Sequence, residues 1–260
     1  MKVSYGIDLG SRFVKVAVDE ESDYRFLGPF DTAEFYRRCV QPGPDGPMLR
    51  RDILGLDDGH AMVCTGYGRA RLANGAIMVP ELEAIAEGVM AITGISNGVI
   101  LDVGGQDSKA LLLRDGRMAD FETNDRCAAS SGRFLENMAR VMAMELEDIG
   151  NYWENPVELS STCAIFGETE LVGLIGEGND LERLAAGVNH AVLRRLLPLL
   201  SRFDFETLVL TGGVAYNKAL VELLRQRTGA EIMVPEKPDF VACVGCCRLG
   251  RKVEERKPSV

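Results

Sequence analysis

The chain has 260 residues, of which 46% are hydrophobic and 26% are charged, and it contains seven cysteines but only two histidines. This length accommodates one large domain or two modest lobes with a buried core. The formal net charge of −10 disfavours nucleic acid as a partner, because an acidic surface repels the phosphate backbone. Two histidines disfavour a multi-histidine metal site and a histidine-centred catalytic triad.

The N-terminus and the hydropathy of the chain predict a cytoplasmic protein without a membrane contact. Residues 1–6 lead directly into an apolar strand pattern and show neither an apolar signal core nor a small-residue cleavage site. No run of about 18 apolar residues occurs, so we expect no membrane-spanning helix. An odd number of cysteines in a chain without an export signal also argues against a disulfide framework.

In the first part of the chain, period-2 alternation and short apolar runs predict strands, and a longer segment predicts a helix. The helix begins with Pro80, which is favoured in a first turn, and ends before Gly94. A tight turn is expected at Gly10-Ser11, and a loop is expected over 42–47, which is rich in proline and glycine. The predicted elements are strands over 3–10, 13–19, 24–30 and 61–64 and a helix over 80–93.

The second part of the chain predicts a further hairpin and then a largely helical region. The hairpin is centred on Asp115-Gly116, and Asn124 or Asp125 is expected to cap the helix that follows it. The predicted strands are 99–103, 109–114, 117–123, 208–210 and 232–234, and the predicted helices are 126–144, 163–175, 181–200, 218–227 and 240–253. The tail from 254 to 260 is expected to fray.

A short internal repeat links the two parts. Asp8-Leu9-Gly10-Ser11-Arg12-Phe13-Val14-Lys15 and Asp102-Val103-Gly104-Gly105-Gln106-Asp107-Ser108-Lys109 carry aspartate, glycine and lysine at equal offsets. Both octets lie where one predicted strand turns into the next. This placement predicts an internal duplication.

Three predicted strands end in glycine-rich turns, which are typical of a phosphate-binding site. The turns follow Asp8, Asp102 and Thr211. Glycine lets the backbone approach a phosphate chain closely, and the turns present N–H donors. The two aspartates are suited to hold Mg²⁺ through water, and the third turn is suited to lie under a nucleoside. Neither a P-loop nor a Rossmann fingerprint occurs.

Taken together, these motifs resemble the actin/hexokinase-like superfamily of ATPases. More closely, the sequence is similar to the activator component of 2-hydroxyacyl-CoA dehydratases and to the ATPase subunits of benzoyl-CoA reductase, which form one family. The resemblance covers nearly the whole chain. It is carried by Gly6–Ser11, Thr65–Arg69, Leu101–Lys109, Asn124–Ala129, Gly132–Glu136, Cys163 with Phe166 and Glu168, and Thr211–Ala215.

The resemblance implies an α/β fold of two ribonuclease-H-like lobes with ATP and Mg²⁺ between them. We expect residues 1–95 to form the first lobe, with the C-terminal helix 240–260 packed back on it, and residues 96–239 to form the second lobe. Catalysis is assigned to Asp8, Asp102, Gln106 and Asp107, where Gln106 orients the attacking water or Asp107 activates it. The residues assigned to nucleotide binding are Gly10, Ser11, Lys15, Gly104, Gly105, Lys109, Gly212, Gly213 and Asn217. Lys15 fits a solvated strand residue equally well, and Asn217 fits a helix cap.

The resemblance also implies a redox centre. In the family, the residues that match Cys127 and Cys163 in two identical subunits bind one 4Fe–4S cluster per homodimer. Four thiolates are the usual ligand set of such a cluster, and two per chain require a second chain. The implied partners are the subunits of an acyl-CoA dehydratase or reductase, with reduced ferredoxin or flavodoxin as the electron donor. Without the flanking motifs, two buried cysteines would be the simpler interpretation.

Several interpretations stay open at this point. The chain could be the ATPase subunit of a benzoyl-CoA reductase, a small-molecule kinase of the same fold, or a nucleotide-binding module without redox chemistry. Cys243, Cys246 and Cys247 depart from the family pattern and fit either helix packing or a second metal site. Ser130-Ser131 also departs from the family, which often has Gly-Thr there. Glu168 and Glu170 are interpreted as exposed helix surface.

Overall fold

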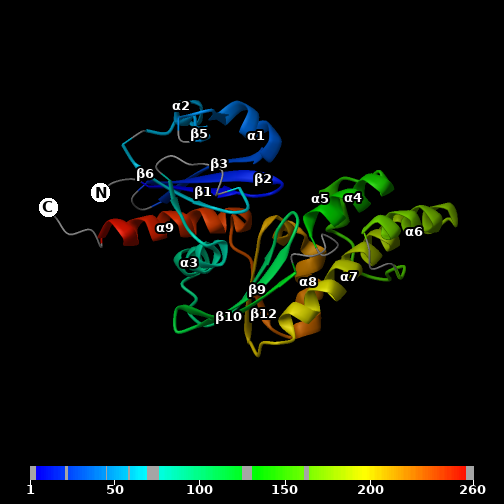
Figure 1. Ribbon diagram of the computed structural model, residues 1–260. Helices are drawn as coiled ribbons and strands as arrows, with labels where there is room; N and C mark the ends of the chain where they lie inside the picture. Colours follow the sequence, from blue (N-terminus) through cyan, green and yellow to red (C-terminus); the bar gives the residue numbers. More distant parts are fainter. Residues whose placement is uncertain are drawn as a thin grey trace. The chain divides into compact units, whose positions relative to one another are not determined.

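The computed structural model describes residues 4–20, 23–44, 46–57, 59–68, 76–124, 131–160 and 164–255 (Figure 1). The chain divides into two compact units, one of which comprises Met1–Ile95 with Phe240–Val260 and the other Ser96–Asp239. Each unit is built on a five-stranded mixed sheet with helices packed on it. The fold is therefore mixed α/β, as the sequence predicts.

The sheet of the first unit has the strand order β3-β2-β1-β6-β7. Its first three strands form an antiparallel meander, and β6 and β7 continue it in parallel. The strands are β1 (Ser4–Leu9), β2 (Phe13–Glu20), β3 (Asp23–Asp31), β6 (Ala61–Thr65) and β7 (Ala76–Met78), and a separate pair comprises β4 (Val40–Gln41) and β5 (Met48–Leu49). The helices are α1 (Thr32–Cys39), α2 (Arg51–Leu54), α3 (Glu81–Thr93) and α9 (Val241–Glu255).

The C-terminal helix α9 belongs to the first unit, where its backbone is in direct contact with the backbone of α3 and of β1. A Cβ on Gly245 would lie 1.7 Å from the carbonyl oxygen of Ala84, and one on Gly88 would lie 1.9 Å from that of Val241. A Cβ on Gly6 would lie 1.9 Å from the carbonyl oxygen of Cys243. Only glycine permits these approaches, so three glycines fix where α9 sits.

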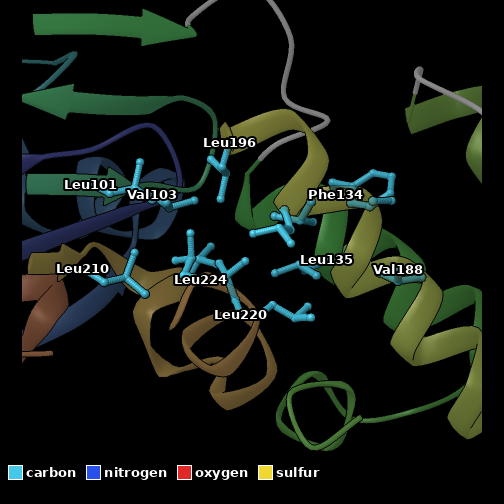
Figure 2. Close-up of a cluster of buried hydrophobic side chains, with 14 of the residues drawn as sticks. Leu101, Val103, Phe134, Leu135, Val188, Leu196, Leu210, Leu220 and Leu224 are labelled. Carbon is cyan, nitrogen blue, oxygen red and sulfur yellow. The ribbon is translucent and has the colours of Figure 1, made fainter. Parts of the chain in front are cut away.

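The sheet of the second unit has the strand order β10-β9-β8-β11-β12. Its strands are β8 (Gly98–Val103), β9 (Ser108–Arg114), β10 (Arg117–Asn124), β11 (Thr207–Thr211) and β12 (Glu231–Met233). The helices are α4 (Gly132–Met142), α5 (Leu146–Ile149), α6 (Ala164–Gly176), α7 (Leu181–Leu200) and α8 (Lys218–Thr228), with short 3₁₀ turns η3 (Gly213–Tyr216) and η4 (Pro238–Phe240). Leucine, valine and phenylalanine side chains from β8, β11, α4, α7 and α8 meet in one core (Figure 2).

The two sheets repeat each other in topology and in register, which confirms the duplication that the octets predict. Asp8 lies opposite Lys15 between β1 and β2, and Asp102 lies opposite Lys109 between β8 and β9. In the parallel direction, Asp8 lies beside Thr65 and Asp102 beside Thr211. The repeat therefore extends to the parallel strand pairs β1–β6 and β8–β11, although β6 and β11 lie outside the two octets.

Helix α4 begins later than the sequence predicts. Asn124, one of the two expected caps, is the last residue of β10, and Ser131 is the N-cap of a helix that starts at Gly132. Asp125, the other expected cap, lies outside the described residues. The helix also ends at Met142, because Ala143 adopts a left-handed conformation with φ of 52°. Local propensity predicts the wrong start, because the first turn of α4 is fixed by hydrogen bonds to the Gly104-Gly105 turn, which is distant in the sequence.

Within the residues that the structure describes, no helix is both long and apolar enough to cross a membrane.

Candidate functional site

The first glycine turn follows β1 and is held by neighbours of its own unit. Asp8 is 8% exposed, and Lys15 Nζ lies 2.9 Å from Asp8 Oδ2. The turn at Gly66, after β6, lies against it, since a Cβ there would be 2.6 Å from Asp8 Oδ1. Gly68 N donates a 3.0 Å hydrogen bond to Leu9 O. Gly10 and Ser11 follow in the turn itself, so a carboxylate, a lysine and two backbone turns converge here.

The second glycine turn follows β8 and also joins a carboxylate, a lysine and a neighbouring turn. Asp102 Oδ1 accepts a 2.9 Å hydrogen bond from Thr211 Oγ1. Lys109 is 6% exposed, and its Nζ lies 2.8 Å from Asp107 Oδ2. Gly104 N donates to Asp107 O at 3.0 Å, which closes the turn, and Gln106 is exposed on it. The sequence-assigned residues of this turn therefore occupy one compact loop.

The third glycine turn, at Thr211-Gly212-Gly213, packs directly on the second. Gly212 has a φ of 83°, and a Cβ there would lie 2.3 Å from Val103 O. Within the part of the chain that the structure describes, and apart from the adjoining backbone, nothing lies within 4 Å of the position of a Cβ on Gly213. The backbone at Gly213 is thus open to close approach by a ligand.

A pocket of about 500 Å³ lies beside this third turn. Its lining includes the aromatic side chains of Trp153 and Tyr216 and the charged side chains of Lys218, Glu222 and Arg225. Tyr216 is 55% exposed, so its ring is available at the pocket wall. Aromatic faces with a few polar groups are typical of small-molecule sites. The sequence does not reveal this pocket, because its lining comes from three separate segments, around 153, 215–225 and 234–236.

Asn217 connects this turn to the interior. Its side-chain oxygen accepts from Leu220 N at 2.9 Å, which caps α8, and its amide donates to Asn189 Oδ1 at 2.8 Å. Asn189 is fully buried and donates to the carbonyl oxygens of Ile149 and Tyr152, both at 2.8 Å. The capping interpretation of Asn217 is confirmed, and its contact with a nucleoside stays a prediction.

A direct bond network joins the second glycine turn to the start of α4. Gly104 O accepts from Gly132 N at 2.9 Å, and Gly105 O accepts from Arg133 N at 3.0 Å. The hydroxyl of Ser131, which is fully buried, donates to Gly105 O at 3.0 Å. First-turn N–H groups of a helix need partners outside it, and here the turn supplies them. This is why α4 begins at Gly132.

The two candidate cluster ligands, Cys127 and Cys163, lie outside the described residues, but the residues that flank them are described. Cys127 stands between the end of β10 and the start of α4, and Cys163 directly precedes α6. Asn137 Nδ2 donates to Glu168 Oε2 at 2.8 Å and so ties α4 to α6. With a rise of 1.5 Å per residue, this contact is about 8 Å along α4 and about 6 Å along α6 from their first residues.

The starts of α4 and α6 lie in neighbouring parts of the unit, because the contact between Asn137 and Glu168 is within two turns of each start. Among the described residues, which do not include Cys127 and Cys163, no group of three or more His, Cys, Asp or Glu side chains is arranged to hold a metal.

The other cysteine group, on α9, is buried in the first unit. Cys243 Sγ donates to Lys15 O at 3.2 Å, and Cys247 Sγ donates to Ala17 O at 3.5 Å. Burial raises the pKa of Cys247 to about 12, and it also raises the pKa values of Cys243 and Cys246 well above their usual range. Thiols that stay protonated are poor metal ligands and poor nucleophiles. The structure thus favours packing for Cys243, Cys246 and Cys247.

The interpretation of Glu168 and Glu170 as plain helix surface is wrong. Glu168 holds Asn137, as described above, and Glu170 Oε1 accepts from both Ser160 N at 2.8 Å and Ser160 Oγ at 2.7 Å. Both residues are half-buried. Their spacing along the chain carries no signal of these bonds, because both partners come from other segments.

Comparison with known proteins places the chain in a family. Residues 48–249 match the BadF/BadG/BcrA/BcrD ATPase family. The (R)-2-hydroxyglutaryl-CoA dehydratase activating ATPase of Acidaminococcus fermentans is 34% identical over 225 residues, which cover 82% of this chain and 86% of the relative. One of the subunits of the benzoyl-CoA reductase of Thauera aromatica is 28% identical over 163 residues, which cover 58% of this chain and 57% of the relative.

A solved structure agrees with this placement. The activator of the 2-hydroxyisocaproyl-CoA dehydratase from Clostridium difficile, with bound ADPNP, has a TM-score of 0.82 and 27% identity, with 99% of each chain covered. The match extends over both units, which supports the actin/hexokinase-like fold. The chain belongs to the BadF/BadG/BcrA/BcrD ATPase family.

Proposed function

We propose that this protein hydrolyses ATP to drive electron transfer from a 4Fe–4S cluster to a 2-hydroxyacyl-CoA dehydratase. The observation that carries the proposal is the set of hydrogen bonds between the Gly104-Gly105 turn and the first turn of α4. It joins the turn assigned to phosphate to the helix that follows Cys127. A change of nucleotide at the turn thus has a short physical route to the cysteine segment.

The nucleotide part of the proposal rests on the glycine turns. Asp8 in the first unit and Asp102 in the second would each be suited to hold Mg²⁺ through water, and the backbone of Gly10 and of Gly104 would be suited to bind phosphate oxygens. Gln106, exposed on its turn, orients the attacking water, with Asp107 as the alternative. The pocket lined by Trp153 and Tyr216 receives the nucleoside. The ADPNP bound to the related activator supports this assignment.

The redox part rests on Cys127 and Cys163 and on a second copy of the chain. Two thiolates from each copy complete the ligand set, and the bound cluster supplies one electron at low potential. Helix α6, which starts directly after Cys163, exposes Phe166 (69%) and Val172 (57%). Exposed apolar side chains beside a shared centre support an interface between two copies.

Two processes would be coupled. ATP and water give ADP and phosphate, and a cluster held by the thiolates would supply one electron to the dehydratase, with reduced ferredoxin or flavodoxin as the source of the replacement electron. The chain's own residues bind the nucleotide, exclude water from it and hold the thiolates. A dehydratase is favoured over a benzoyl-CoA reductase as the partner, because the dehydratase activators match over more of this chain.

The test is the iron and sulfide content and the native mass of protein purified without oxygen. We expect about four iron and four sulfide per two chains, and ATP hydrolysis that needs Mg²⁺. Cys127→Ala and Cys163→Ala should each abolish the iron, whereas Cys246→Ala should keep it. A monomeric, iron-free wild type would refute the proposal. Sugar-dependent release of ADP from colourless protein would instead identify a kinase, and tight ATP binding without turnover a regulatory module.

A further inference from the structure

The part of the pocket lining that carries Trp153 is bonded to two side chains of α7. Asn189, which is fully buried, donates from its amide nitrogen to Ile149 O and to Tyr152 O, both at 2.8 Å. The next residue of α7, His190, is bonded through Nε2 to Trp153 O at 2.9 Å. A carbonyl oxygen only accepts, so the ring nitrogen is the donor. Two consecutive side chains of one helix therefore bind three carbonyl groups of this short segment.

A second part of the lining is bonded to the same buried amide. Asn217 stands between Tyr216 and Lys218, which both line the pocket. Asn217 Nδ2 donates to Asn189 Oδ1 at 2.8 Å, while its own Oδ1 caps α8. Both donor hydrogens and the acceptor oxygen of the Asn189 amide are therefore in use, and they join two separate segments of the pocket lining.

These bonds start from a rigid support. Val188, the neighbour of Asn189 on α7, and Leu220 in the first turn of α8 are buried in one core (Figure 2). Ala219 N also donates to Gly150 O at 2.7 Å, so the two segments meet through their backbones as well. A buried amide that makes all of these hydrogen bonds favours a single arrangement, because a shift would leave polar groups unpaired.

We infer that Asn189 and His190 are positioning residues for the nucleoside, because they fix Trp153 relative to Tyr216. The inference rests on the proposed function, which places the nucleoside in this pocket. Neither Asn189 nor His190 is among the described residues that line it, so both act through the residues that do. An aromatic wall that is already ordered binds a flat base without a further entropy cost. The expected effect is therefore on nucleotide affinity and not on the chemical step.

The experiment uses the fluorescence of Trp153, the single tryptophan of the chain, in protein purified without oxygen. ADP with Mg²⁺ should change the emission, and its titration gives a Kd. Asn189→Leu keeps the approximate size of the side chain but removes its three hydrogen bonds. It should raise the Kd for ADP about 3–10-fold, the factor that one neutral hydrogen bond contributes. The kcat at saturating ATP should stay within about twofold of the wild-type value.

Two controls separate positioning from a general loss of structure. Asn151→Leu makes the same change at an exposed side chain of the same segment, where the amide is 3.5 Å from Glu147 O, and it should keep the wild-type Kd. His190→Phe keeps a ring but removes the donor, so it should raise the Kd about 3-fold. His190→Gln retains an N–H donor for Trp153 O and should restore the Kd toward the wild-type value.

The outcomes separate this inference from the proposed function. Wild-type protein that neither binds ADP nor hydrolyses ATP would refute both. ADP binding, measured by calorimetry, that leaves the emission of Trp153 unchanged would refute the inference alone. Equal Kd values for Asn189→Leu and Asn151→Leu would do the same, as would a fall in kcat as large as the rise in Kd.

Circular dichroism and urea unfolding check that Asn189→Leu is folded. If it is not, the two variants of His190 decide the question. A Kd that rises in His190→Phe and is restored in His190→Gln supports the inference. A Kd that is equal to the wild-type value in both variants refutes it.

Discussion

Asp8 and Asp102 hold equivalent positions near the ends of β1 and β8. Asp8 lies beside the ammonium group of Lys15, Asp102 accepts a hydrogen bond from Thr211, and Lys109 lies beside Asp107. The octet repeat predicts that both aspartates lie at a turn, and the register confirms it. It could not predict the contacts with Thr211 and Asp107, because neither residue has a counterpart among the positions that the two octets share.

The carboxylate of Asp102 gives the first prediction. Asp102→Asn keeps the shape and an oxygen for Thr211 Oγ1, but it removes the negative charge assigned to the Mg²⁺ site. We expect the kcat for ATP hydrolysis to fall about 10²–10³-fold, the range for loss of one charge-stabilising group. Phosphate release with Mg²⁺ measures it. Thr211→Val, which removes only the hydrogen bond, should reduce kcat much less. Wild-type kcat in Asp102→Asn would contradict the assignment.

The buried thiols of Cys64 and Cys247 give a prediction about pH. Burial raises both pKa values to about 12, from an ordinary value of 9.0. An unfolded chain releases these protons near pH 9, while the folded chain keeps them. The stabilisation is therefore complete below pH 9 and is lost as the pH rises toward 12. Each thiol loses up to about 1.4 kcal/mol per pH unit in that window.

Urea unfolding of a Cys64→Ala/Cys247→Ala variant checks this behaviour. At pH 7 the variant should be less stable than the wild type by about 1 kcal/mol per thiol, because each loses a buried group of roughly methylene size. At pH 10 the difference should be smaller. A difference that is the same at both pH values would show that the thiols do not stay protonated in the folded chain.

At the scale of elements, long periodic segments were predictable and short ones were not. The helices over 80–93, 181–200 and 218–227 have the expected position, because each carries an apolar face and a recognisable cap. Helix α1 was missed, although Asp31 caps it by accepting from Ala33 N and Glu34 N. Only two buried residues, Phe35 and Cys39, mark its face, which is too weak a period to recognise.

The contact of α9 with α3 gives an element-scale prediction. Gly245→Ala would place a methyl group 1.7 Å from Ala84 O, which is backbone and has little room to move. We expect it to destabilise the protein by about 1–3 kcal/mol or more. In Gly173→Ala, the new methyl group would meet none of the described residues within 4 Å outside the backbone of α6 itself, so this change should stabilise by about 0.5–1 kcal/mol. Urea midpoints compare the two, and equal midpoints would contradict the close contact.

At the scale of the whole molecule, the duplication explains why one fold supplies paired turns. Each unit repeats the sheet order, the hairpin register and a Thr-Gly turn beside the aspartate. The second unit then adds α4 to α7 between β10 and β11, and this insertion carries Cys127 and Cys163. Sequence alone indicated the repeat and the cysteines. It did not indicate their connection, because hydrogen bonds from backbone N–H groups leave no residue signature.

The last prediction concerns that connection. Gly132 is the first residue of α4, where proline is favoured, and Ser131 before it is extended with ψ of 175°, as a residue before proline should be. Gly132→Pro should therefore keep the helix while replacing the N–H that donates to Gly104 O with the ring Cδ, so the turn loses this hydrogen bond and moves away from α4. Gly132→Ala is the matched control, since it keeps the N–H and its methyl group would meet only ordinary contacts at 3.5 Å.

The measurement, which rests on the proposed cluster, is the rate at which a chelator removes iron from protein purified without oxygen, with ADP or with a non-hydrolysable ATP analogue. In the wild type and in Gly132→Ala, the two nucleotides should give different rates, because the Gly104-Gly105 turn moves with the phosphates and carries the start of α4. In Gly132→Pro the two rates should converge, although nucleotide affinity persists. If Gly132→Pro keeps the full wild-type difference, the signal passes to the cysteines by another route, such as the buried pair of Asn189 and Asn217.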